Sequence, residues 1–308
     1  MTAPFRRVTA GERTIQMPDR PQPGPADAAA KQVQAHLAQA GLIPAQARLW
    51  PLSGGQTNRL WRVETATGDL VVKLYATTPG NPLFTNDPAA EAALLRYLDG
   101  TGLAPRLHAA LDTPSGPVLL YAHVGGTPWR DDPRPVARAL ARLHRLPPPG
   151  LAAAPDGSAA LSRQTRAILD LCDPAAARPL RRLEPAGSVP PSGEAALLHG
   201  DPVPGNLIQT PGHLVLIDWQ CPAAGDPVHD LALFLSPAMQ QVYRGRPLSP
   251  ADETRFLTAY GDDAAVERYH ALAAWFHWRM VAYCLWRTGC GAADYRPALA
   301  LECARLGA

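Results

Sequence analysis

Residues 199–206 read HGDPVPGN, and Ile217-Asp218-Trp219 follow a short distance later. Together they are the most informative stretch for predicting the fold of this 308-residue chain. The loop carries a carboxylate at Asp201 and, after four residues, an amide at Asn206. Two short apolar runs around a Thr-Pro-Gly turn follow, and they predict a hairpin that ends at Asp218. Carboxylate and amide oxygens are the ligands that Mg²⁺ prefers. The stretch therefore predicts two acids and an amide gathered around a hard cation.

An Asp followed after four residues by an Asn is the arrangement of a kinase catalytic loop. In that arrangement Asp201 accepts or orients the proton of a substrate hydroxyl, and Asn206 and Asp218 hold Mg²⁺. By itself the loop pattern is weak, because Asp and Asn are common in turns. The preceding His-Gly pair and the hairpin that ends in a second acid strengthen the interpretation.

Residues 1–124 predict a small antiparallel β-rich lobe that contains one important helix, and residues 1–25 are expected to be flexible. A helix is also predicted over 28–40, before the sheet. Runs rich in β-branched and aromatic residues, separated by turn residues, predict strands at 47–50, 60–64, 70–75, 106–111 and 118–123. Asp87-Pro88 predicts the start of a helix over 89–98.

Lys73 lies in the third predicted strand and Glu91 in the helix that follows. A kinase needs a strand lysine on the nucleotide phosphates and a helix glutamate that holds the lysine in place. Between the first two strands lies a turn whose backbone could cover the phosphates, made of Ser53, Gly54, Gly55, Thr57 and Asn58. After the last strand, Tyr121 and His123 lie where a hinge between lobes would offer backbone groups to an adenine.

Residues 125–308 predict a larger, mainly helical lobe. Helical spacing of apolar residues predicts helices over 135–146 and 159–172, and again from Val228 to the end of the chain. Residues 182–194 are rich in Pro, Gly and Ser and predict a linker. The expected fold is α+β and two-lobed.

These segments together resemble the aminoglycoside phosphotransferase and choline kinase family, whose members have a protein-kinase-like fold. The resemblance rests on residues in family order, which are Ser53-Gly54-Gly55, Thr57-Asn58, Lys73, Glu91, His199-Gly200-Asp201, Pro204-Gly205-Asn206, Ile217-Asp218-Trp219 and Asp226-Pro227-x-x-Asp230-Leu231-Ala232. It implies ATP, or GTP, together with Mg²⁺, with Asp201 as catalytic base and Asn206 and Asp218 as metal ligands. Gln220 departs from the family pattern, since many relatives carry Glu there. Asp226 is expected to cap the helix that follows it and Asp230 to brace the catalytic loop by hydrogen bonds, both as structural support.

The acceptor is expected to be a small molecule with a hydroxyl group, bound by the C-terminal helices. The Pro204-Gly205-Asn206 segment favours bacterial choline-kinase-like members and an amino alcohol such as choline or ethanolamine, with an aminoglycoside, thiamine or a sugar as alternatives. Aromatic and acidic side chains there could form a cage for an amine, although aromatic residues at helical spacing are more often core. The aromatic candidates are Phe256, Tyr260, Tyr269, Trp275, Phe276, Trp278, Tyr283, Trp286 and Tyr295, and the acidic ones are Asp252, Glu253, Asp262, Asp263, Glu267 and Asp294.

Composition excludes other classes of protein. A formal charge of +2 argues against a nucleic-acid binder. No secretory signal or membrane-spanning stretch is visible, and five irregularly spaced cysteines indicate free thiols, so a cytoplasmic protein is expected. Only Lys31 and Lys73 are lysines among the 29 basic residues, which makes the placement of Lys73 notable. The sequence carries no signal for an oligomeric state.

Two rival classes stay open. A metal-dependent hydrolase could use His199, Asp201, His213 and Asp218 as ligands, but this reading leaves Lys73 and Glu91 unexplained. A nucleotide-binding pseudokinase that acts through partners is the other alternative. The complete set of lysine, glutamate, aspartate and asparagine positions argues against it.

Overall fold

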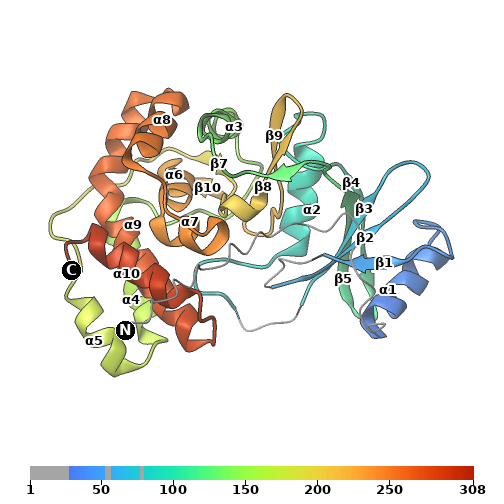
Figure 1. The fold of residues 1–308 in the computed structure, drawn as a ribbon, viewed down its shortest axis with the longest axis horizontal. Helices are drawn as coiled ribbons and strands as arrows, with labels where there is room; N and C mark the ends of the chain where they lie inside the picture. The colour runs from blue at the N-terminus through green and yellow to red at the C-terminus, as the bar shows by residue number, and fades with distance from the viewer. Residues whose placement is uncertain (1–27, 53–56, 77–79) are drawn as a thin grey trace, which may run out of the picture.

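The computed structural model describes residues 28–52, 57–76 and 80–308, so the expectation of a flexible 1–25 lies outside the described residues. A sheet of five antiparallel strands, in the order β1-β2-β3-β5-β4, forms one end of the molecule (Figure 1). Its strands are β1 (Leu49–Pro51), β2 (Arg59–Val63), β3 (Leu70–Leu74), β4 (Leu107–Thr113) and β5 (Gly116–Ala122). All five predicted strands are confirmed.

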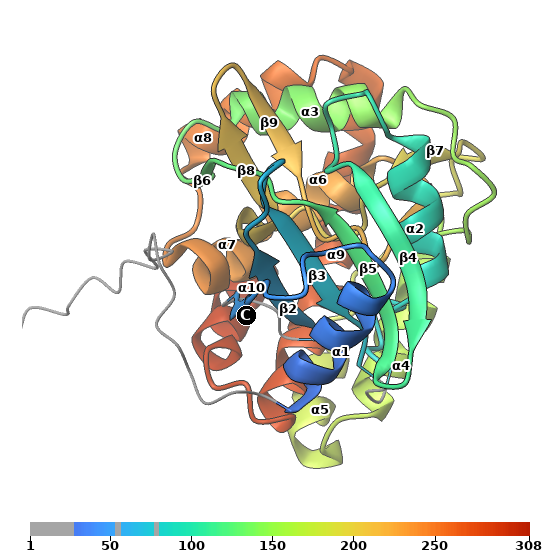
Figure 2. The same ribbon diagram turned by 90° about the vertical axis from the view of Figure 1, so that its right-hand side faces the viewer.

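The two faces of this sheet are covered by different helices because alternate residues of a strand point to opposite faces. Val72 packs with the buried residues of α1 (Ala28–Gln39), which lies in front of the sheet in Figure 2. Val71 packs on the other face, with α2 (Pro88–Tyr97). Lys73 lies two residues after Val71, so the strand directs its side chain to the α2 face, into the interior.

The second part of the molecule is mainly helical, and its longest helix is α9 (Asp263–Gly289), which packs against α4, α6 and α10 (Figure 1). The predicted helices correspond to α3 (Arg134–His144) and α4 (Gly157–Asp170). From Val228 the chain is helical as predicted, with α6 (Val228–Leu235), α7 (Pro237–Arg244), α8 (Pro250–Tyr260), α9 and α10 (Tyr295–Arg305). Helix α5 (Pro174–Arg181) was not predicted, because Pro179 lies in its interior. Over the described ranges, no helix combines the length and the hydropathy needed to cross a membrane.

Small β elements fix both halves of the 199–219 stretch. The predicted hairpin is β8 (Leu207–Thr210) with β9 (His213–Leu216), joined at its edge by β6 (Thr127–Pro128). Strand β7 (Ala196–Leu198) pairs with β10 (Ala223–Gly225). Because β7 ends just before His199 and β10 begins shortly after Asp218, this pairing ties the loop before Asn206 to the segment after the hairpin.

Candidate active site

A buried cluster of charge forms around Lys73. Its Nζ lies 2.6 Å from Glu91 Oε2 and 2.5 Å from Asp218 Oδ1, and its side chain is completely buried. The hydroxyl of Tyr75, one residue after β3, also donates to Glu91. The cluster therefore joins β3, α2 and the end of the β8–β9 hairpin.

The charge of Lys73 is stable despite its burial. Burial by itself lowers the pKa of a lysine, but the carboxylates of Asp218 and Glu91 outweigh that effect and hold the pKa well above its ordinary value. The lysine thus stays an ammonium inside the protein. The structure confirms that the two predicted partners, Lys73 and Glu91, meet.

Asp201 and Asn206 face each other across the loop. Asn206 Nδ2 donates to the backbone oxygen of Asp201 at 2.9 Å and to its Oδ2 at 3.1 Å. Within the described residues this leaves Asn206 Oδ1 without a hydrogen-bond donor, and that amide oxygen is the atom Mg²⁺ would take. Burial, and then the charge of Asp218, raise the pKa of Asp201 to about 8.

Asp230, on α6, holds the start of the same loop. Its two carboxylate oxygens accept the backbone N–H groups of His199 at 2.8 Å and Gly200 at 2.9 Å. His144 Nε2 lies 3.1 Å from the same carboxylate. The expectation that Asp230 supports the loop is confirmed.

His199 links the loop to the hairpin. Its Nδ1 accepts the backbone N–H of Asp201 at 3.2 Å, which leaves Nε2 to donate to the Ile217 oxygen at 3.1 Å. This pattern fixes one tautomer of the neutral ring, in agreement with burial lowering the pKa of His199. His199 therefore positions the backbone on either side of the site, as a neutral group.

Two backbone conformations at the site are unusual. Gly200 has φ +82°, and a Cβ there would come within 2.1 Å of the Cys221 oxygen, so no other residue fits. Asp218 has φ 63° and is the only non-glycine residue with positive φ in the part of the chain that the structure describes. Such strained residues cluster at functional sites.

The described part of the glycine-rich turn reaches the site through Asn58. Ser53, Gly54 and Gly55 lie outside the described residues. Asn58 is buried and donates from Nδ2 to Gln220 Oε1 at 2.9 Å, and its Oδ1 accepts the Ala76 backbone N–H at 3.2 Å. Gln220, the departure from the family pattern, thus connects the turn to the segment that carries Asp218.

The predicted hinge residues lie at the end of β5 and just beyond it. Tyr121 is buried in β5 and His123 is half-buried just beyond it. The backbone N–H of His123 already donates to the Asp69 oxygen at 2.8 Å. Neither residue lines the hollow around Asp201, so their contact with an adenine stays a prediction.

A polar hollow, called the transfer hollow below, surrounds the reacting groups. It is lined by Asp201, Asn206 and Asp218 together with Thr57, Asn58 and Gln220. The remaining lining residues are Leu60, Asn81, Phe84, Met239, Tyr243, Tyr283, Arg287 and Tyr295. The hollow therefore combines two carboxylates with three tyrosines.

The predicted aromatic cage is only partly assembled. Tyr283 and Tyr295 line the transfer hollow, and their rings lie 5.9 Å apart at 83°. Six of the other candidates are buried core residues, namely Phe256, Tyr260, Tyr269, Trp275, Phe276 and Trp278. None of the predicted acidic candidates lines the transfer hollow. Sequence reasoning missed Tyr243 and Arg287, although Arg287 follows Tyr283 at the helical spacing that places both on one face.

The ligand set of a metal-dependent hydrolase does not assemble. His213 is exposed at the start of β9 and bonds to Thr210 at 2.9 Å, within the hairpin turn. Across the described ranges, no group of three or more His, Cys, Asp or Glu side chains is arranged to hold a metal ion. All five cysteines are free thiols, as predicted.

Residues 48–275 match the model of the phosphotransferase enzyme family, and this range is more than half of the chain. The chain belongs to this family. Among curated proteins, the search found no match. The resemblance seen in the sequence is therefore confirmed at the level of the family.

Solved structures similar to this phosphotransferase share its fold at low sequence identity. A choline/ethanolamine kinase family protein from Mesorhizobium loti is 18% identical, with a TM-score of 0.62 over 90% of this chain and 93% of that one. An ethanolamine kinase from Plasmodium vivax is 13% identical, with a TM-score of 0.61 over 88% and 87%. A thermostable mutant of an aminoglycoside phosphotransferase is 14% identical, with a TM-score of 0.61 over 89% and 98%. The protein-kinase-like two-lobed fold is thus confirmed.

Proposed function

We propose that this phosphotransferase moves the γ-phosphoryl group of ATP to a hydroxyl of a small molecule, with Mg²⁺. The observation that carries the proposal is the buried cluster of Lys73, Glu91 and Asp218, because it ends beside Asp201 and Asn206 in one hollow. A similar structure, 15% identical, is a ternary complex of an aminoglycoside phosphotransferase with AMP-PNP and hygromycin B, which favours ATP as donor. GTP is the alternative donor.

Each predicted residue then has a role. Lys73, held by Glu91, binds the nucleotide phosphates, and the turn of Ser53, Gly54, Gly55, Thr57 and Asn58 covers them. Asn206 and Asp218 offer the oxygen ligands that suit Mg²⁺. Tyr121 and His123 mark the hinge beside the adenine, and the boundary between the lobes falls after Val124.

Bound at these groups, ATP supplies the transferred phosphoryl group and Mg²⁺ neutralises its charge. Asp201 orients the acceptor hydroxyl and takes its proton at Oδ1, because Oδ2 is bonded to Asn206. The acceptor oxygen forms a bond to phosphorus while the bond to the β-phosphate oxygen breaks, and Lys73 attracts the departing phosphate. Burial and the charge of Asp218 raise the pKa of Asp201, which makes its carboxylate a stronger proton acceptor.

Choline- and ethanolamine-like amino alcohols are the first acceptors to test. The loop motif favours them, and the tyrosines Tyr243, Tyr283 and Tyr295 could attract an ammonium group through their ring faces. Aminoglycosides, thiamine and sugars are the alternatives within the same fold.

The test is turnover of ATP, with GTP in parallel, over a panel of these acceptors, read as phosphorylated acceptor by ³¹P NMR. Asp201→Asn is expected to reduce turnover by roughly 10²–10⁴-fold while ATP binding persists. Asp112→Asn, at an exposed position in β4, is the matched control and should change nothing. Near-normal turnover in Asp201→Asn would refute the assignment of the base. Stabilisation of the fold by ATP without turnover of any acceptor would favour the pseudokinase.

A further inference from the structure

A second cavity of about 300 Å³ lies beside the transfer hollow, and we call it the Arg279 cavity. Phe84 lines both spaces. The cavity is also lined by Gly200, directly before Asp201, and by Cys221, directly after Gln220. Lys73, Tyr121 and His123 do not line it. It therefore opens beside the segments that carry Asp201 and Gln220.

Among the residues that the structure describes, Arg279 is the only charged one in the lining of this cavity, and its side chain is buried. Most of the other lining is apolar, with Leu83, Leu198, Leu233 and alanines at 152–154. A cation inside an apolar wall is costly unless a charge of the opposite sign is close. The lack of a negative charge among the lining residues of the cavity therefore needs an explanation.

The described part of the chain provides only neutral partners for Arg279. Its Nη1 donates to Gln164 Oε1 at 3.2 Å and to His229 Nδ1 at 3.3 Å, and its guanidinium lies 4.8 Å from the centre of the Phe276 ring. Nε is buried and has no hydrogen-bond partner, and Nη2 bonds to no described residue. Burial lowers the pKa of Arg279 to about 10, and no carboxylate acts against that.

His229 makes this arrangement specific. Its Nε2 donates to the Pro155 oxygen at 2.6 Å, so Nδ1 is the acceptor for Arg279. Burial lowers the pKa of His229 to about 3, and the ring stays neutral. The nearby acids are engaged elsewhere, since Asp156 pairs with Arg268 and Asp230 holds the loop. The guanidinium is thus positioned without being neutralised.

We infer that the Arg279 cavity binds an anionic group of the acceptor, a carboxylate or a phosphate, while the hydroxyl of the same molecule lies at Asp201. The planar fork of an arginine suits both groups, and Nη2 is the donor left over that is not fully buried. This inference rests on the proposed function and narrows its acceptor to hydroxy acids or phosphorylated alcohols. It departs from the amino-alcohol expectation, because the predicted acidic side chains line neither this cavity nor the transfer hollow.

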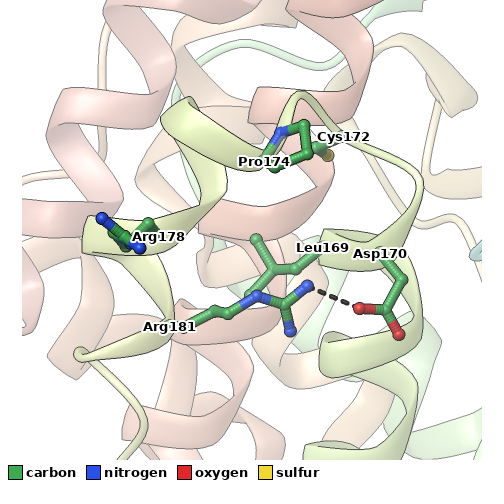
Figure 3. Close-up of a pocket in the computed structure, with 6 residues that line it drawn as sticks. All are labelled: Leu169, Asp170, Cys172, Pro174, Arg178 and Arg181. Atoms are coloured by element: carbon green, nitrogen blue, oxygen red, sulfur yellow. Dashed lines mark hydrogen bonds and ion pairs between the residues drawn. The ribbon is translucent and has the colours of Figure 1, made fainter.

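Another arginine-lined cavity, of about 310 Å³, shows the contrast (Figure 3). It lies between α4 and α5, where Arg181 pairs with Asp170 at 2.5 Å and both side chains are well exposed. A carboxylate already pairs with that exposed arginine, so the cavity has no built requirement for an anion. Arg181 provides a matched control for Arg279.

The experiment compares acceptors that differ only at the end opposite the hydroxyl. Wild-type protein with MgATP is given 4-hydroxybutyrate, 1,4-butanediol or 4-amino-1-butanol, and glycerol 3-phosphate is compared with glycerol. A series of ω-hydroxy acids from three to eight carbons finds the length that reaches from Arg279 to Asp201. We expect the best acid to exceed its diol and its amine at least 30-fold in kcat/KM. The carboxylate and phosphate pairs tell the two anions apart.

Arg279→Met should remove most of this preference by raising KM for the acid, and should leave turnover of the diol and KM for ATP unchanged. Arg279→Lys should keep part of it, because charge is retained without the fork. Arg181→Met should behave as wild type. Loss of diol turnover together with acid turnover would mean that Arg279 has a merely structural role, which would overturn the inference.

An inhibition measurement keeps the test independent of any variant. Butyrate, which has no hydroxyl, should compete with the acceptor and not with ATP. Non-competitive inhibition would place the anion at a separate site, and absence of inhibition would remove the anion site; either result overturns the inference. Good turnover of amino alcohols alone would overturn it and leave the proposed function intact. Failure of every acceptor, with Asp201→Asn indistinguishable from wild type, would count against the proposed function itself.

Discussion

Lys73 and Arg279 are both buried cations at the site, and the protein treats them in opposite ways. Lys73 has two carboxylates within 2.6 Å. Arg279 has an amide, a neutral imidazole and an aromatic ring. Burial lowers the pKa of both, yet only Lys73 has enough negative charge nearby to raise it again.

The difference indicates how each cation is expected to respond when an anion binds. A lysine already balanced by carboxylates is a fixed part of the scaffold, and it can add a phosphate contact without an initial penalty. An arginine that lacks a countercharge lowers the stability of the empty protein and gains most when an anion arrives. The following changes test this contrast, in order of expected effect.

Lys73→Met should have the largest effect. It leaves Glu91 and Asp218 facing each other without a cation, so turnover should fall more than about 10³-fold and stability by roughly 3–5 kcal/mol. Lys73→Arg should also lose most activity, because the fully buried site has no room for a larger planar group. Turnover and urea unfolding measure both effects. Substantial activity in Lys73→Arg would show that the lysine is not required.

Asp218→Asn should reduce turnover by about 10²-fold or more and weaken its dependence on Mg²⁺ concentration. Asn tolerates the positive φ of residue 218, so this change removes charge with little backbone strain. Asp218→Ala would combine both effects and is the less clean variant. A Mg²⁺ titration of turnover is the measurement, and an unchanged titration curve would remove Asp218 from the metal site.

The neutral partner of Arg279 predicts a pH dependence of stability. The folded-state pKa of His229, about 3, lies below the ordinary value of about 6.5. The neutral His229 ring therefore makes its full contribution to the free energy of unfolding above pH 6.5. That contribution is lost as the pH falls from 6.5 towards 3, and the loss is on the order of 2 kcal/mol at pH 5. His229→Asn should lose less stability between pH 7 and pH 5 in urea unfolding, with the remaining slope due to groups such as His199. Equal slopes in both proteins would show that His229 is not held neutral.

Arg279→Met should have the smallest effect, and it should raise stability rather than lower it. Removing an unbalanced buried charge is expected to raise stability by about 1 kcal/mol, even though Gln164 and His229 lose a donor. Thermal and urea unfolding at pH 7, with Arg181→Met as control, measure it. A loss of more than about 1 kcal/mol would mean that the neutral contacts of Arg279 outweigh its burial cost, and the contrast with Lys73 would weaken.

The sequence predicted the residues around Lys73 but not the burial of Arg279, and the reason is physical. Lys73, Glu91, Asp201, Asn206 and Asp218 are needed by chemistry of known spacing, so their residue types and order were enough to bring them together. Arg279 stands among apolar and aromatic residues of α9, where a helical arginine normally reaches water. Its burial follows from how α9 packs against α4 and α6, and local sequence does not record that packing.

The acceptor prediction shows the same limit. Aromatic and acidic residues of the C-terminal helices were treated as one set, but burial separates them. Phe256 and Trp278 are completely buried, while Tyr283 and Tyr295 reach the transfer hollow. Helix α5 was missed because of Pro179 in its interior, although Asp173-Pro174 is the same start signal as Asp87-Pro88.

Asp230 has a consequence for the order in which this enzyme is built. Two backbone N–H groups of the catalytic loop donate to the carboxylate of Asp230, which lies about 30 residues later in the sequence. Asp230 belongs to α6, a helix buried in the C-terminal core. During synthesis or refolding, the loop therefore has no stable shape until α6 has docked. Activity should therefore appear only when α6 has packed into the helical lobe. It should be lost when α6 detaches, even while the five-stranded sheet is still intact.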